Sequence, residues 1–297
     1  MTLEHTRRRR QAVNTIHDIV SAMRAIAAGR IQGAQRALAG AGRYQEVILR
    51  ALTNLAIDPS MLPAPVSGRQ TFLLVLTSEQ PLCGAFNQNV LALAERRWHE
   101  LRDDGGVHLL MVGERGTRQL LARGIKPDSV EPGATSLQGV RDLVKRLAPL
   151  VDRHYAALGL GPVHVIYSRY QSISQQVPTE EELLPPDLSA LERLPLPAGG
   201  RCFHYLPLPE LLAGLLGQYA FISLYRMAAE SYAGEQASRL IAMDGATHNT
   251  ERIGKALLDL ERRERQGEIT RQVLELIGAR FATDHSQRNQ RRRKRGP

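Results

Sequence analysis

The segment LTSEQPLCGAFNQNV, residues 76–90, is the part of the sequence that most resembles a reactive site. Apolar, β-forming residues lead into a turn that presents Cys83 beside a glycine. A thiol that a strand delivers into a turn can act as a nucleophile when its surroundings favour the thiolate. The alternative is that Cys83 is a small, half-buried hydrophobe at the end of a strand, and we favour this second interpretation.

Other catalytic signatures are missing from the sequence. It contains no GxxxxGK[ST] phosphate loop, no GxGxxG after a strand and no GxSxG nucleophile elbow. The histidines are scattered without HxxxH or HExxH spacing, and Cys83 and Cys202 cannot form a metal cage alone. Glu180, Glu181 and Glu182 read as a solvated loop face. We therefore predict no catalytic residue, no metal and no cofactor.

The charge of the chain is concentrated near its ends. Of the net charge of +9 over 297 residues, the segment 283–297 contributes +5, and residues 7–10 form a block of four arginines. The body is therefore not a uniformly basic nucleic-acid binder. No stretch of about 18 apolar residues and no signal-peptide core occurs. These features fit a reducing, cytosolic compartment.

The prolines divide the chain into three parts. Fifteen of the 16 prolines lie between Pro59 and Pro209, so two proline-free arms flank a central region. Because proline breaks helices, each arm can be one long helix. In the first arm, apolar residues recur at steps of three or four, which predicts a narrow helical seam: Val13, Ile16, Val20, Met23, Ala27, Ile31, Ala34, Leu38, Ala41, Tyr44, Ile48, Leu52 and Leu55. Its many Ala and Gly residues suit close helix packing.

The central region reads as α/β. Short apolar runs at 71–78, 107–113 and 162–170 alternate with helical patterns, which predicts a largely parallel sheet. The proline-rich segment 177–200 reads as a loop or short helix, and FHYLP at 203–207 is a candidate last strand. The predicted fold is α/β, with two long terminal helices forming an antiparallel coiled coil around a small, Rossmann-like domain. We expect a shaft helix at 1–58, the α/β domain at 59–208, a second shaft helix at 209–282 and a basic, disordered tail at 283–297.

Three separated motifs resemble the γ subunit of F-type ATP synthases. LTSEQPLCGAFNQNV is similar to that family's (T/S)-(S/D)-x-x-LCG-x-FN-x-N signature. The first arm is similar to its I-x-x-AM-x-x-VAA helix. AAESYAGEQASRLIAMDGATHNT resembles its E-x-x-ASE-x-x-AR-x-x-AM-x-x-AT-x-N block, and Arg265-Gln266 with Ile269-Thr270 matches RQ-x-x-IT.

The resemblance implies a rotor subunit without bond chemistry of its own. It implies a coiled-coil shaft inside a head of α and β subunits, and an α/β foot beside the ε subunit and the membrane c-ring. It places the chain on the cytoplasmic face of a bacterial inner membrane as a peripheral subunit, with no nucleic-acid partner. The shaft residues implied to contact partners are Met23, Arg24, Arg265, Gln266, Thr270 and Glu275. The residues implied to shape the foot are Ser78, Leu82, Cys83, Gly84, Phe86 and Asn87.

The sequence also departs from the family pattern. Gln80-Pro81 replaces Arg-Gly before LCG, and Glu261-Arg262 replaces Tyr-Asn before the RQ pair. The basic tail is an addition. These differences indicate a divergent bacterial form, with an alternative N-type ATPase as one interpretation. Two other classes stay open at this point, a cysteine-dependent α/β enzyme and a nucleic-acid-binding coiled-coil protein that uses the basic ends.

Overall fold

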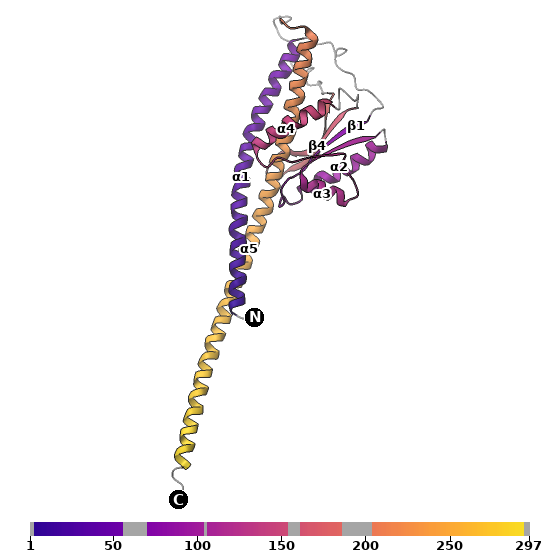
Figure 1. Cartoon of the computed structure of the whole chain (residues 1–297). Helices are drawn as coiled ribbons and strands as arrows, with labels where there is room; N and C mark the ends of the chain where they lie inside the picture. Colours follow the sequence, from indigo (N-terminus) through magenta and orange to yellow (C-terminus); the bar gives the residue numbers. More distant parts are fainter. Residues whose placement is uncertain (1–2, 56–69, 104–105, 154–160, 186–203, 294–297) are drawn as a thin grey trace. The chain divides into compact units, whose positions relative to one another are not determined.

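The computed structural model describes residues 3–55, 70–103, 106–153, 161–185 and 204–293. The chain divides into two units, one formed by residues 1–22 with 244–297 and the other by residues 23–243. Helices α1 (Leu3–Asn54) and α5 (Leu208–Arg293) each contribute to both units (Figure 1). Neither is interrupted by proline, since α1 has none and Pro209 lies in the first turn of α5, where proline is tolerated.

The unit of residues 23–243 contains a five-stranded sheet with the order β3-β2-β1-β4-β5. Its strands are β1 (Thr71–Leu76), β2 (Val107–Val112), β3 (Ser129–Glu131), β4 (Val163–Tyr170) and β5 (Gln176–Leu184). The first four are parallel and β5 is antiparallel to β4. The predicted α/β class is confirmed, and the four parallel strands follow the order 3-2-1-4 with which the Rossmann order begins.

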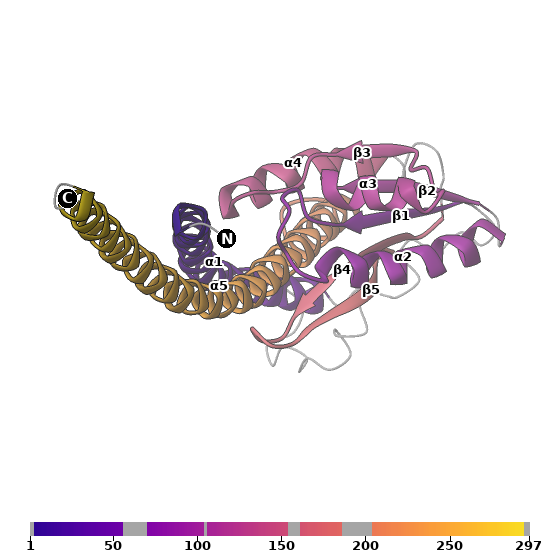
Figure 2. The same ribbon diagram turned by 90° about the horizontal axis from the view of Figure 1, so that it is seen from below.

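Helices cover both faces of this sheet. Phe72, Leu74 and Leu76 of β1 face α4 (Leu137–Asp152) and the buried sides of α1 and α5. The alternate residues Leu73 and Val75 face α2 (Phe86–Asp103) and α3 (Glu114–Ala122). Figure 2 shows α2 and α4 on opposite sides of the strands. Every residue of β1 is buried, which explains its continuous apolar run.

Strand β5 lies where we expected a loop or short helix. Residues 176–184 pair with β4 through a hairpin whose turn includes a hydrogen bond from Gln175 N to Ser172 O. The described part of 203–207, from His204 onward, is not a strand, so the expected last strand there is wrong. Pro178 does not prevent pairing because β5 is an edge strand, where a missing N–H is tolerated.

Helices α1 and α5 run antiparallel within each unit. In residues 23–243, Ala41, Ile48 and Leu52 pack with Leu212 and Ile222. The pairing direction is also visible in the other unit, where His17 Nδ1 lies 3.1 Å from Thr250 Oγ1 and Arg7 Nε donates to Glu261 Oε1 at 2.9 Å. Along these contacts, the residue numbers increase in α1 while those of their partners decrease in α5. The antiparallel pairing of the terminal helices is therefore confirmed within each unit.

Helix α5 continues past residue 282, where we expected the second shaft helix to end. It runs to Arg293, through most of the segment that we expected to be a disordered tail. No glycine or proline interrupts residues 279–295, so no helix breaker lies there. Residues 294–297 lie outside the described part of the chain. None of the described helices is long and apolar enough to cross a membrane.

Candidate partner-binding site

The turn between β1 and α2 is a closed cluster of buried polar groups. Ser78 is fully buried and Asn87 is 4% exposed. Ser78 N donates to Asn87 Oδ1 at 3.0 Å, and Asn87 Nδ2 donates to Ser78 Oγ at 2.8 Å. Phe86, at the start of α2, fills the core below the turn. Ser78 and Asn87 therefore satisfy each other's hydrogen-bonding groups, and these buried hydrogen bonds fix the shape of the turn.

Cys83 lies inside this cluster and has the properties of a packing residue. Its thiol donates to Ser78 Oγ at 3.4 Å, and its side chain is buried among apolar residues of the α2 face. Burial raises the pKa of the Cys83 thiol, which disfavours the thiolate that a nucleophile requires. The geometry therefore supports the structural interpretation of Cys83 over the catalytic one.

The same turn contacts helix α5. Arg239 Nη2 donates to the carbonyl oxygen of Pro81 at 3.3 Å. Gly84 adopts a φ of +56°, which glycine adopts without strain, and a Cβ there would lie 3.6 Å from the Ser238 carbonyl oxygen. Leu82 also has a positive φ, of +68°, and its side chain is 53% exposed. The turn thus fixes the sheet domain to α5 while presenting one apolar side chain to solvent.

A buried ion pair on α5 supports this contact. Arg239 Nη2 donates to Glu235 Oε1 at 2.7 Å, and the two side chains are 4% and 7% exposed. Burial raises the pKa of Glu235 to about 7, although the Arg239 guanidinium opposes that rise. Arg239 Nε and Nη1 are buried with no hydrogen-bond partner among the described residues. Such a pair fixes geometry more than it adds stability.

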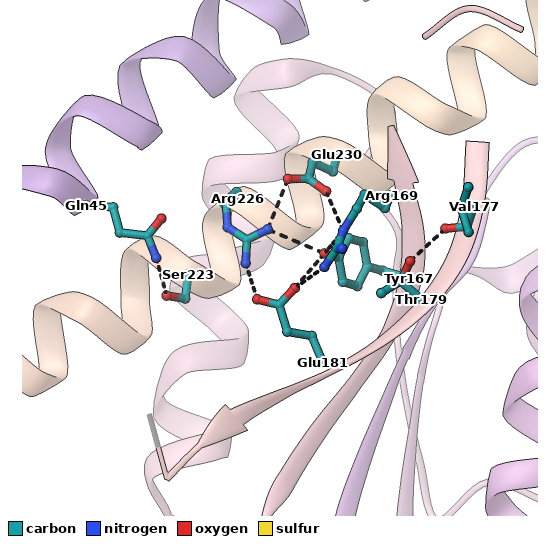
Figure 3. A network of polar contacts seen from close by, with 9 residues as sticks. All are labelled: Gln45, Tyr167, Arg169, Val177, Thr179, Glu181, Ser223, Arg226 and Glu230. Atoms are coloured by element: carbon teal, nitrogen blue, oxygen red, sulfur yellow. Dashed lines mark hydrogen bonds and ion pairs between the residues drawn. The ribbon is translucent and has the colours of Figure 1, made fainter. Parts of the chain in front are cut away.

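A larger polar network joins strands β4 and β5 to α5 (Figure 3). Tyr167 Oη and Arg169 Nη2 each donate to Glu181 Oε2 at 2.8 Å. Arg226 pairs with Glu181 and, at 3.0 Å, with Glu230 Oε1. Burial would raise the pKa of Glu181, but Arg226 and the other donors hold it below its usual value. Glu181 is therefore part of an internal network and not of the solvated loop face that we expected.

Glu180 corrects the same expectation on the other face of β5. Its Oε1 atom accepts from Arg97 Nε at 2.8 Å and lies 2.9 Å from His164 Nδ1. These donors hold the pKa of Glu180 below its usual value against the effect of burial. Of the three glutamates only Glu182 is exposed, and it too lies in strand β5 and not in a loop. Charge pairing from distant segments therefore allows this acidic run to form a strand.

We expected the Ala and Gly residues of α1 to allow close packing between helices, but this does not hold for all of them. Gly40 has open space where a Cβ would stand, although Ala34 is fully buried. An open groove of about 660 Å³ runs between α1, α4 and α5. It is lined by Ala37, Gly40, Ala41, Tyr44, Leu137, Gln138, Arg141, Lys145, Phe221, Ile222 and Tyr225.

The residues near the end of α5 that we predicted to bind partners are exposed. Arg265, Gln266, Thr270 and Glu275 all face solvent. Thr270 Oγ1 donates to the Gln266 carbonyl oxygen at 2.9 Å. Within the described part of the chain, the side chains of Arg265, Gln266 and Glu275 have no ion-pair or hydrogen-bond partner. Their donors and acceptors are thus available to another molecule.

Apolar side chains accompany these polar groups. Five aliphatic residues in this part of α5 are 46–72% exposed: Ile269, Val273, Leu274, Leu276 and Ile277. A contiguous apolar surface of this kind marks a region that another surface covers. On α1, Arg24 is exposed and Met23 is half-buried; both belong to the unit of residues 23–243. The family resemblance, and not a local pattern, singled out Arg265, Gln266 and Thr270; the structure shows that all three are exposed.

The chain was compared with known proteins. The ATP synthase family model matches residues 2–282. The ATP synthase gamma chain of Hyphomonas neptunium is 32% identical over 289 residues, covering 93% of this chain and 97% of the relative. That of Methylobacterium nodulans is 32% identical over 290 residues with the same coverage.

Solved structures share the fold. A chain of the Euglena gracilis mitochondrial ATP synthase, in a structure of OSCP, F1 and the c-ring, has a TM-score of 0.62 at 15% identity and covers 96% of this chain and 95% of its own length. A chain of the Tetrahymena thermophila central stalk and c-ring has a TM-score of 0.56 at 22% identity, covering 77% and 99%.

The fold and the exposed surfaces define a class of protein, a stalk that presents helical surfaces to other chains. This chain belongs to the family of ATP synthase gamma chains. Such a chain is the central-stalk subunit of a rotary ATPase and is non-catalytic, because catalysis takes place on the β subunits.

Proposed function

We propose that this chain transmits torque between a membrane c-ring and a catalytic head of α and β subunits. Its terminal helices α1 and α5 form the shaft, and the sheet domain between them forms the foot beside the ε subunit and the c-ring. The complex lies on the cytoplasmic face of a bacterial inner membrane. The observation that carries this proposal is the exposed surface near the end of α5, where polar and aliphatic side chains lack a cover within the described chain.

Arg265 and Gln266 contact the β subunits in this proposal. Arg265 carries a planar fork of donors that can bind a carboxylate through two hydrogen bonds. Gln266 adds an amide donor and acceptor, and Thr270 follows one helical turn later on the same face. Because these groups are exposed, the contact can form and break without leaving a buried charge unpaired. It would act as a latch between the rotor and the head at each step.

The experiment replaces both latch residues in the assembled complex. Arg265→Ala with Gln266→Ala should slow ATP hydrolysis and lower the ions pumped per ATP, while nucleotide binding to the head stays normal. An exposed ion pair in the upper part of its usual range contributes roughly 0.4–1 kcal/mol, so each loss should be about two- to fivefold unless the contact is dry. The control is Arg263→Ala, another exposed arginine on the same helix. Wild-type hydrolysis and pumping in the double variant would reject the latch.

Assembly itself is tested separately. The chain should co-purify with α and β subunits in a fixed ratio when the three are expressed together. Failure to do so, with all three chains folded, would reject the rotor assignment. Turnover by the isolated chain that is lost in Cys83→Ala would instead support the enzyme alternative, and tight, salt-sensitive binding to DNA would support the nucleic-acid alternative.

A further inference from the structure

The arginine block at the start of α1 faces a carboxylate one turn before the latch. Glu261 precedes Arg265 by four residues on α5. A glutamate placed four residues before a basic residue is the favoured orientation for an ion pair on a helix surface. On an isolated helix, Glu261 would therefore be expected to pair with Arg265 and to occupy its donors.

The structure gives Glu261 different partners. Arg7 Nε donates to Glu261 Oε1 and Arg10 Nε donates to Glu261 Oε2, both at 2.9 Å. The Glu261 side chain is 14% exposed, against 49% and 34% for the two arginines. The hydrogen bond from Arg7, followed by the contribution of Arg10, lowers the pKa of Glu261. Both carboxylate oxygens are thus occupied by α1.

Arg265 is left without a partner as a result. It is exposed, and it makes no ion pair with a described residue. Glu268, three residues later, is exposed and is not paired with it. The neighbouring Arg262 pairs instead with Asp259 at 3.7 Å. Arg265 therefore keeps its whole fork of donors available, as does the exposed Arg263.

We propose that Arg7 and Arg10 are positioning residues for the latch, because they hold Glu261 away from Arg265 and so keep Arg265 available to a carboxylate of the head. This inference rests on the proposed function. It assigns a role to Arg7 and Arg10 of the basic block of α1 and to Glu261 of α5. The ion pairs of Arg7 and Arg10 with Glu261 join α1 to α5. They also prevent the ion pair that Glu261 would otherwise form with Arg265.

A variant cycle separates this role from simple helix pairing. The variants are R7Q/R10Q, E261Q and the triple R7Q/R10Q/E261Q, each in the assembled complex, with R265A as reference and R7K/R10K as the conservative control. The measurements are the rate of ATP hydrolysis and the ions pumped per ATP. R7Q/R10Q releases Glu261 to pair with Arg265 and should lose about two- to fivefold, as R265A does.

The other variants should behave differently. E261Q removes the competing carboxylate together with the α1 contact, so it should stay within about 1.5-fold of wild type. The triple variant should recover the loss seen in R7Q/R10Q, and R7K/R10K should remain near wild type because both positive charges are kept. A role limited to joining the helices predicts instead equal losses in R7Q/R10Q, E261Q and the triple variant.

Each outcome bears on the inference. Equal losses across the cycle, or no loss in R7Q/R10Q while R265A is impaired, would overturn the inference and leave the latch intact. No loss in R265A would overturn both, because no latch would exist for Arg7 and Arg10 to serve. Helix content and melting temperature of each purified chain show whether a loss arises from unfolding, and the triple variant, which lacks the same α1 contacts as R7Q/R10Q, is the matched comparison.

Discussion

Two stretches of helix α5 differ in how far their side chains are buried within the chain. Between residues 226 and 239 the helix lies against the sheet and α1, and its small residues Ala229, Ala233 and Ala237 are fully buried. Its charges are paired inside the chain, as in Arg239 with Glu235. Between 265 and 277 the charged side chains are exposed and five aliphatic side chains are 46–72% exposed. The same helix is thus covered by other parts of the chain in the first stretch and left exposed in the second.

Backbone preference does not explain this difference, since both stretches are continuous α-helix. The difference lies in side-chain size and in what each side chain meets. Alanine allows another backbone to approach closely, whereas long aliphatic residues project toward a surface that must come from elsewhere. Variants in the first stretch should therefore change the stability of the isolated chain. Variants in the second should change the assembled complex.

Arg226→Ala should produce the largest loss of stability. It removes a cation that pairs with Glu181 and Glu230, and leaves both carboxylates partly buried without that charge. Breaking a buried pair in this way costs roughly 3 kcal/mol, near the low end of the usual range because the site is only partly buried. Urea unfolding followed by the fluorescence of Trp98, which packs against the α2 face of the sheet, measures this loss.

The matched control lies on the exposed stretch. Arg262→Ala removes an arginine that is 70% exposed and pairs with Asp259 at 3.7 Å. Its effect on unfolding should be below about 0.5 kcal/mol. Similar losses for both arginines would mean that burial does not distinguish the two stretches of α5.

The helical seam of α1 shows how far the sequence could lead. Ala27, Ile31 and Leu52 are buried as predicted, because a step of three or four keeps residues on one face. Ile16 and Tyr44 belong to the same predicted seam but are 50% and 45% exposed. Periodicity identifies the face that can be buried. It does not tell how much of that face the partner helix of the same chain covers.

Strand β5 could not be found from its own residues. Three consecutive glutamates and three prolines in the segment 176–186 favour a solvated loop when only local sequence is considered. Glu181 becomes acceptable in a strand only because Arg169 and Arg226 approach it from β4 and α5. The i, i+4 spacing of Arg226 with Glu230 was present in the sequence, but such pairs usually lie on a solvated face. The burial depends on tertiary contacts that local patterns do not contain.

Two carboxylates on α5 should respond to pH in opposite directions. Burial raises the pKa of Glu235 to about 7, so the folded chain binds a proton there that the unfolded chain releases above about 4.5. The stability that this group contributes therefore falls as pH rises from about 4.5 to about 7, by on the order of 3 kcal/mol. Glu261 has a lowered pKa, so its contribution is lost as pH falls below about 4.5.

Subtracting the Glu235→Gln variant from the wild type isolates the first effect. Because Arg239 stays charged throughout, the loss of its partner gives a constant offset. The unfolding free energy of the wild type relative to the variant should decrease between pH 5 and pH 8, measured by urea unfolding. A difference that stays constant with pH would mean that Glu235 titrates normally, as an exposed glutamate does.

A pair of glycines on α5 gives a smaller and more direct comparison. A Cβ at Gly234 would lie 2.9 Å from Ser168 Oγ, whereas a Cβ at Gly267 would meet nothing within 4 Å. Gly267→Ala should stabilise the helix by about 0.5–1 kcal/mol, since alanine is the better helix former. In Gly234→Ala the overpacking cost of roughly 1–3 kcal/mol should exceed that gain. Circular dichroism melts of the two chains should shift in opposite directions, and equal upward shifts would contradict the close contact at Gly234.

At Cys83, the residue that first suggested chemistry, we expect a small loss of stability and no loss of activity. Cys83→Ala removes a small buried group, but Asn87 Nδ2 still donates to Ser78 Oγ at 2.8 Å, so the turn keeps its main hydrogen bonds. The free energy of unfolding should fall by about 1 kcal/mol, and ATP hydrolysis by the assembled complex should stay unchanged.

Alkylation by iodoacetamide tests the thiol directly in a Cys202→Ser background, where Cys83 is the remaining cysteine. Because burial covers Cys83 and raises the pKa of its thiol, the folded chain should react far more slowly than the urea-unfolded chain at the same pH. Rapid alkylation of the folded chain, with loss of hydrolysis in Cys83→Ala despite normal assembly, would restore the nucleophile interpretation of the turn.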